Sequence, residues 1–117
     1  MTKDQLFLLP PAFRDPSQGS GPFFCVDCST VEGMLSFFPE LREQIDVHYI
    51  AFPKPRMPLV ELLGDAHQNC PTLVVVGDTS HADLLTTSAA TGRLFATDPL
   101  AITAYLIARY KISAVHP

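Results

Sequence analysis

The stretch Cys25-Val26-Asp27-Cys28 decides the fold prediction, together with Cys70-Pro71 and the run Thr72-Leu73-Val74-Val75-Val76 that follows it. The first stretch is a C-x-x-C pair that comes after a short apolar run and opens a helical pattern. The second places a cysteine and a proline directly before an apolar run that is typical of a buried strand. We therefore expect a functional site where the start of this helix meets the start of this strand.

Composition places the chain among globular proteins. Its 117 residues are 47% hydrophobic and 17% charged, which favours one domain over residues 1–117 with a single core. The net charge of −4 argues against nucleic acid and membrane surfaces as partners, because both select basic patches. The first nine residues lack the features of a signal peptide, and no apolar run approaches the roughly 20 residues of a membrane span. We expect a cytoplasmic protein.

Three cysteines are too few, and odd in number, for a disulfide scaffold. In a reducing compartment a C-x-x-C pair is more often catalytic, redox-active or metal-binding than structural.

Apolar runs predict four strands. Two of them are apolar on both faces, as buried strands are, and another alternates apolar and polar residues. The predicted strands cover residues 6–9, 45–52, 72–76 and 93–96.

Helical spacing of apolar residues predicts three helices. The first ends at Pro39, and the last has Asp98 as its cap and Pro99 as its first residue. A short helix over residues 82–85 and a Pro-, Gly- and Ser-rich loop over residues 10–22 complete the pattern. The apolar faces are formed by Val31, Met34, Leu35 and Phe38, then by Leu59, Leu62, Leu63 and Ala66, and finally by Ile102, Tyr105, Leu106 and Tyr110.

The element order β-α-β-α-β-β-α predicts a four-stranded mixed sheet with helices on both faces, an α/β fold. In this topology strands one and two end, strand three begins and strand four ends at one edge of the sheet. That edge should gather the residues Cys25, Cys28, Lys54, Arg56, Cys70, Pro71, Thr97 and Asp98.

Cys25 is the predicted nucleophile, because free N–H groups and the dipole at a helix start stabilise a thiolate. Cys28 lies one turn further on, where a resolving thiol is expected. Asp27 opposes thiolate formation, although an acid in the first turn favours the helix. The alternative is a residual C-x-x-C in a fold used only for binding.

Cys70 adds a third sulfur, which would lie within reach of Cys25. It could form an alternative disulfide there, and it is one of the predicted substrate-contact residues. With His67 it has H-x-x-C spacing, so Cys25, Cys28, Cys70 and His67 form a Cys3His set that suits tetrahedral zinc or an iron–sulfur cluster. Each residue also has a simpler interpretation: a histidine at a helix end for His67, and a small buried apolar residue for Cys70.

Two pairs of residues predict ligand contacts. Lys54 and Arg56 could hold a carboxylate, and Thr97 with Asp98 and the following N–H groups could hold a second charged group. The alternatives are a solvated loop for the first pair and helix capping for the second.

The sequence resembles an uncharacterised bacterial family of thioredoxin-like domains. The resemblance is carried by residues 23–28, 31–35 and 38–41, and then by residues 52–56, 68–71 and 73–75. The resemblance covers most of the chain. It implies a thioredoxin or glutaredoxin fold, a cis Pro71 packed against the dithiol, and thiol–disulfide exchange by Cys25 and Cys28. Val26 replaces the proline usual after the first cysteine, and the tryptophan common before the motif is absent.

By the same resemblance, the substrate would be a protein disulfide or a glutathione mixed disulfide. Lys54, Arg56, Pro71, Thr97 and Asp98 would then form the glutathione-binding edge. The resemblance requires no cofactor, and it fits a monomer or a homodimer. Two alternatives stay open: a zinc or iron–sulfur module, and a redox-silent interaction domain.

Overall fold

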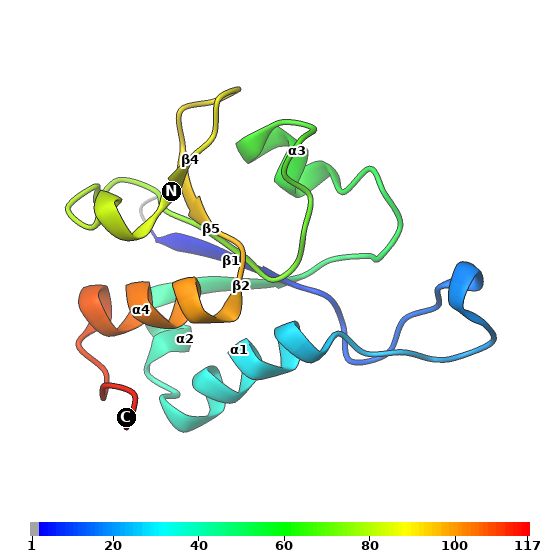
Figure 1. The fold of residues 1–117 in the computed structure, drawn as a ribbon, viewed down its shortest axis with the longest axis horizontal. Coiled ribbons are helices and arrows are strands. Elements are labelled where there is room, and N and C mark those ends of the chain that lie inside the picture. Colours follow the sequence, from blue (N-terminus) through cyan, green and yellow to red (C-terminus); the bar gives the residue numbers. More distant parts are fainter. Residues whose placement is uncertain (1–2) are drawn as a thin grey trace.

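The computed structural model of the chain describes residues 3–117, so residues 1 and 2 of the predicted domain lie outside the described residues. A five-stranded mixed sheet runs through the molecule in the order β2-β1-β3-β5-β4 (Figure 1). β1 is parallel to β2, and every other neighbouring pair is antiparallel. The strands are β1 (Asp4–Leu8), β2 (Ile45–Tyr49), β3 (Thr72–Val74), β4 (Thr86–Thr87) and β5 (Leu94–Ala96).

The predicted sheet of four strands is corrected to five. The additional strand, β4, is two residues long and pairs Thr86 with Phe95 and Thr87 with Leu94. Both threonines are exposed, so the strand has no apolar run from which it could be recognised. The four predicted strands are present, each with somewhat different ends.

The helices are α1 (Val26–Phe37), α2 (Leu41–Gln44), α3 (Met57–Leu63) and α4 (Pro99–Tyr110), with 3-10 turns at Pro16–Gln18 and Ala82–Leu84. The sequence pattern did not predict α2, a single turn that buries only Leu41. It also extended the second predicted helix to Ala66, whereas α3 ends at Leu63 and is followed by Gly64 with a φ of 88°. A positive φ is readily adopted by glycine and stops the helix there.

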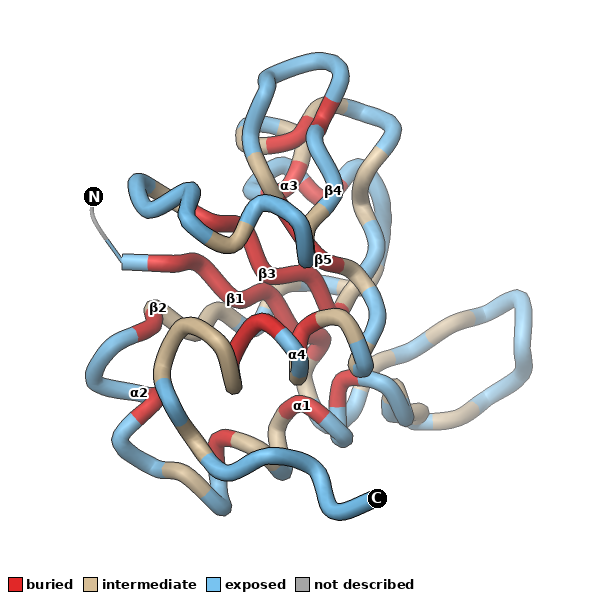
Figure 2. Tube along the Cα trace, turned by 60° about the vertical axis from the view of Figure 1, so that its left-hand side comes forward, coloured by how far each residue is buried: buried red, intermediate tan, exposed pale blue. Residues whose placement is uncertain are grey.

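Alternate residues of the central strands pack on opposite faces of the sheet. Leu6, Leu8 and Leu73 face α1 and α4, whereas Phe7 and Val74 face α3. Helices therefore cover both faces, as the sequence predicts. Figure 2 shows the buried residues gathered along the central strands and on the sides of the helices that face them.

A long loop joins β1 to α1 and stands out from the sheet in Figure 1. Phe13 and Phe23 pair across it in an antiparallel bridge, and the ring of Phe13 stacks on Phe52 with 4.8 Å between centroids. These contacts anchor both ends of the loop, so the chain enters α1 from a fixed position.

Within residues 3–117, none of the helices combines the length and the apolar character needed to cross a lipid bilayer.

Candidate functional site

The strand register gathers the predicted site loops at one edge of the sheet. Leu8 and Tyr49 are paired at the ends of β1 and β2, and Phe7 is paired with Thr72 at the start of β3. β5 is antiparallel to β3, so it ends at Ala96 on the same edge. The predicted convergence of the four loops is thus present in the structure.

Cys25 is the N-terminal cap of α1. Its backbone is extended, and its sulfur accepts a hydrogen bond from the backbone N–H of Cys28, with 3.2 Å between N and Sγ. A sulfur in this position occupies the place of the usual Ser, Thr or Asp cap and meets the positive end of the helix. Cys25 is half-buried, so part of it is open to solvent.

Cys28 has a contrasting environment. Only 4% of its surface is exposed, and its sulfur accepts a hydrogen bond from the N–H of Leu9 at 3.4 Å. Burial raises the pKa of the Cys28 thiol to about 12, the sulfur of Cys25 adds to the rise, and the Leu9 N–H acts against it. The two thiols of the motif therefore differ in their access to solvent.

Cys70 lies beside Cys25. The carbonyl oxygen of Cys70 is 3.8 Å from the sulfur of Cys25. Burial raises the pKa of the Cys70 thiol to about 11, and the nearby Arg56 guanidinium lowers it in part. The Cys70–Pro71 peptide bond is cis, as the family resemblance implies, and so is Lys54–Pro55, which sequence analysis did not anticipate. The structure thus brings Cys25, Cys28, Cys70 and Pro71 together.

Arg56 is buried, with 8% of its surface exposed, and the solvated loop considered for it is wrong. Its side chain donates to the carbonyl oxygens of Phe52 and Gln68, each at 2.8 Å, and its guanidinium lies 5.2 Å from the centre of the Phe52 ring. Arg56 thereby holds together the two loops that precede α3 and β3. Lys54, two residues away, is exposed.

Thr97 and Asp98 follow β5 at the same edge of the sheet. The Asp98 carboxylate accepts a hydrogen bond from the N–H of Ala101 at 2.9 Å and caps α4. Capping is the alternative that sequence analysis gave for this pair. Thr97 is half-buried.

His67 lies away from the two cysteines of the motif. Its ring packs on Phe95, 4.5 Å between centroids, on the face covered by α3, whereas Cys28 packs on the face covered by α1. In the described part of the chain no group of three or more His, Cys, Asp or Glu side chains is arranged to hold a metal ion.

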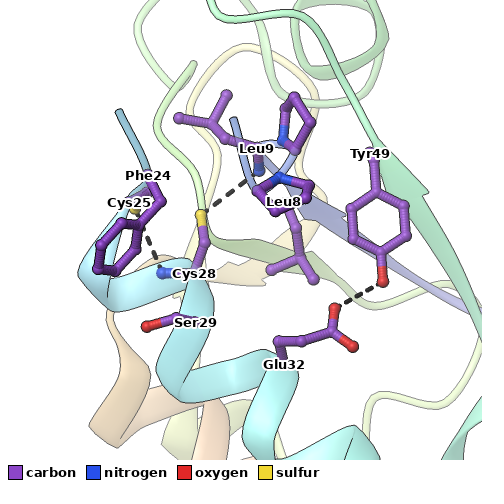
Figure 3. A pocket seen from close by; sticks show the side chains of 10 residues that line it. Leu8, Leu9, Phe24, Cys25, Cys28, Ser29, Glu32 and Tyr49 are labelled. Atoms are coloured by element: carbon purple, nitrogen blue, oxygen red, sulfur yellow. Dashed lines mark hydrogen bonds between the residues drawn. The ribbon is translucent and has the colours of Figure 1, made fainter. Parts of the chain in front are cut away.

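A cleft of about 460 Å³ opens beside the dithiol (Figure 3). It is lined by residues 8–11 at the end of β1, by Phe24, Cys25, Cys28, Ser29 and Glu32 around the start of α1, and by Tyr49 at the end of β2. Figure 3 shows the rings of Phe24 and Tyr49 on opposite sides of the cleft, with the sulfur of Cys28 between them.

The polar side chains at one end of the cleft bond to one another. Tyr49 donates its hydroxyl hydrogen to the Glu32 carboxylate at 2.6 Å, and Arg42 forms an ion pair with the same carboxylate. Sequence analysis singled out neither Tyr49 nor Glu32 as a site residue. The position of Phe24 directly before Cys25 was the one feature of the sequence that pointed to a role in shaping a cleft.

No curated protein and no solved structure matches this chain. A family comparison does give a match, over residues 3–114, to a family described as "Protein of unknown function (DUF3088)". Since this match spans nearly the whole sequence, the chain belongs to that family.

Proposed function

We propose that this chain is a thioredoxin-like thiol–disulfide redox protein in which Cys25 attacks and Cys28 resolves. The observation that carries the proposal is the asymmetry of the dithiol. Cys25 caps α1, is half-buried and accepts the Cys28 N–H at 3.2 Å, whereas Cys28 is buried and its pKa is raised to about 12. An accessible first sulfur and a protected second sulfur suit a two-step exchange.

The topology supports the thioredoxin-like part of the proposal. β1 and β2 are a parallel pair joined through α1, and β3 and β5 continue the sheet in antiparallel order. Cys25 caps the start of α1, and Pro71 directly precedes β3 at the same edge.

The exchange is balanced in electrons and in atoms. The Cys25 thiolate attacks one sulfur of a disulfide, forms a mixed disulfide and releases the other sulfur as a thiolate. The Cys28 thiolate then attacks the Cys25 sulfur, which forms the Cys25–Cys28 disulfide and releases the second thiolate. The substrate disulfide is reduced by two electrons, and a dithiol or two monothiols return the protein to its reduced form.

The cytoplasmic location expected from the sequence would supply such thiols, with glutathione as one candidate reductant. The positions proposed from the sequence for substrate contact are Lys54, Arg56, Cys70, Thr97 and Asp98. Of these, Arg56 and Asp98 already hold backbone partners.

The test is the reaction of purified reduced protein with hydroxyethyl disulfide, followed by intact mass. We expect the wild type to lose two hydrogens and to regain them with dithiothreitol. Cys28→Ser should stop at the mixed disulfide, and Cys25→Ser should form neither product. A Cys25→Ser variant that is oxidised like the wild type would contradict the proposal.

The same samples address the metal hypothesis. Native mass spectra of protein purified without chelators would show a zinc ion or an iron–sulfur cluster as additional mass that is lost on acidification. A metal-loaded wild type whose mass falls to the bare chain in Cys70→Ser would favour the metal module over the redox protein.

A further inference from the structure

We infer that the cleft beside the dithiol binds the uncharged apolar group of a small disulfide, with an aryl disulfide as the type of ligand, and not a charged peptide. This inference rests on the proposed redox function, because it names the substrate class of the same two thiols. The positions proposed from the sequence for substrate contact are not among the residues that line this cleft.

The size and position of the cleft fit a small molecule. Its volume of about 460 Å³ lies within the roughly 300–1,000 Å³ of small-molecule sites. Cys25 and Cys28 are both in its wall. A ligand that occupies the cleft therefore lies against both residues of the dithiol.

The charge distribution selects an uncharged ligand. Among the described residues that line the cleft there is no lysine, arginine or histidine. Its one carboxylate, Glu32, is engaged by the Tyr49 hydroxyl and by Arg42. A ligand carboxylate would lose water and meet no cation among the described lining residues. The Arg42 guanidinium at the polar end is already bonded to Glu32 and Tyr49, so burial of the ligand carboxylate is costly.

The order of the strands separates this cleft from the charged residues of the site edge. Tyr49 ends β2, which lies on the other side of β1 from β3 and the adjoining Pro71. Lys54, Arg56 and Asp98 are not among the cleft residues. The apolar cleft and the Pro71 side are thus two different approaches to Cys25.

Phe24 supplies an aromatic surface at the mouth of the cleft. It precedes Cys25 directly, and 60% of its surface is exposed although its side chain is large and apolar. Aromatic pairs prefer offset or edge-to-face contacts, and such contacts add to the burial of apolar area. An aryl group can pack against Phe24 while its sulfur faces Cys25.

The reaction follows from this placement. The Cys25 thiolate attacks the nearer sulfur of Ar–S–S–Ar, forms Cys25–S–S–Ar and releases one ArS⁻. Cys28 then displaces the second ArS⁻ and closes the protein disulfide. The protein loses two electrons, the aryl disulfide gains them, and the two thiol protons pass to the released thiolates.

The first experiment measures selectivity with two chromogenic disulfides. Reduced protein is mixed separately with uncharged dipyridyl disulfide and with the dianion dithiobis(nitrobenzoate). The rate with each disulfide is divided by the rate at which dithiothreitol reduces the same disulfide, which corrects for the intrinsic reactivity of the two compounds. We expect the protein to favour dipyridyl disulfide by about tenfold or more, and Phe24→Ala to remove most of that preference. Phe37→Ala, at a position on α1 that is 83% exposed, is the matched control and should keep it.

The second experiment removes the chemistry. Dipyridyl sulfide, the one-sulfur analogue, cannot exchange with thiols, so its binding reports on the cleft alone. We expect dipyridyl sulfide to change the chemical shifts of the methyl groups of Leu8 and Leu9. The affinity obtained from this titration should be about tenfold weaker in Phe24→Ala. No binding, or equal corrected rates with the two disulfides, would overturn the inference while leaving the redox function in place.

Two further outcomes separate the proposals. Binding of dipyridyl sulfide to a protein that reacts with no disulfide would reject the redox function and with it the substrate role of the cleft. The protein could instead reduce insulin at a rate that depends on Phe24 and fail to bind dipyridyl sulfide. This result would indicate that the cleft holds an apolar side chain of a protein substrate, and it would overturn the inference.

Discussion

The backbone N–H of Leu9 donates a hydrogen bond to the sulfur of Cys28 across 3.4 Å, and this contact ties the second thiol of the motif to the end of β1. Cys25, by contrast, has its sulfur at the start of α1 and is half-buried. The two thiols are three residues apart in sequence and differ in their access to solvent.

The first prediction concerns the order of alkylation. At about pH 8 we expect iodoacetamide to modify Cys25 first, Cys70 more slowly and Cys28 last, because burial raises the pKa of Cys70 to about 11 and that of Cys28 to about 12. Peptide mapping over a time course gives the order. Equal labelling of Cys25 and Cys28 in the folded protein would contradict the asymmetry on which the proposed function rests.

The second prediction concerns Arg56. Arg56→Ala leaves the carbonyl oxygens of Phe52 and Gln68 without their donor, so we expect a loss of about 2–3 kcal/mol in the free energy of unfolding. Lys54→Ala is the matched control, since Lys54 is exposed in the same loop, and it should change stability by less than about 0.5 kcal/mol. Urea unfolding measures both. Equally small changes in the free energy of unfolding in both variants would indicate that the Arg56 hydrogen bonds do not stabilise the fold.

The third prediction concerns alkaline pH. Tyr105 and Tyr110 donate to the buried Asp4 carboxylate at 2.6 and 2.7 Å. Burial, and then Asp4, raise the pKa of both hydroxyls above the ordinary 10.0. The unfolded chain ionises at the ordinary value while the folded chain stays protonated. The stability from these groups is therefore full below about pH 10 and is lost as the pH rises further.

Thermal unfolding between about pH 8 and pH 11 should show this fall in the wild type. The double variant Tyr105→Phe/Tyr110→Phe should have a shallower pH dependence, whatever its overall stability. An unchanged slope would assign the alkaline loss to other groups.

The fourth prediction separates capping from ligand binding at Asp98. Asp98→Ala removes the acceptor for the Ala101 N–H and should cost about 1 kcal/mol, whereas Asp98→Asn should keep most of the cap. If capping is its role, both variants should react with oxidised glutathione at the wild-type rate. A lower rate in Asp98→Asn at unchanged stability would instead place Asp98 in a glutathione site.

The apolar runs were enough to predict the central strands of this fold. The alternation of Leu6, Phe7 and Leu8 on the two faces of β1, and the run that begins at Thr72, made the central strands recognisable. β4 and α2 were missed because one consists of two exposed threonines and the other buries one leucine. Elements this short are formed by tertiary contacts and leave little periodicity in the sequence.

The sulfur site was predictable for a different reason. Cys25, Cys28, Cys70 and Pro71 sit at element boundaries, and the topology alone brings those boundaries together. The burial of Arg56 was not predictable, because its acceptors, Phe52 and Gln68, belong to separate loops. The cleft was also out of reach, since its walls come from β1, α1 and β2.

The bridge between Phe13 and Phe23 has a consequence for the evolution and engineering of this scaffold. Because the loop is closed at its base, the position of Cys25 does not depend on how many residues lie between the two phenylalanines. Insertions or deletions within residues 14–22 should leave Cys25 in its place beside the cleft. The loop is therefore a place where a tag, an epitope or a targeting sequence can be grafted without displacing the two cysteines.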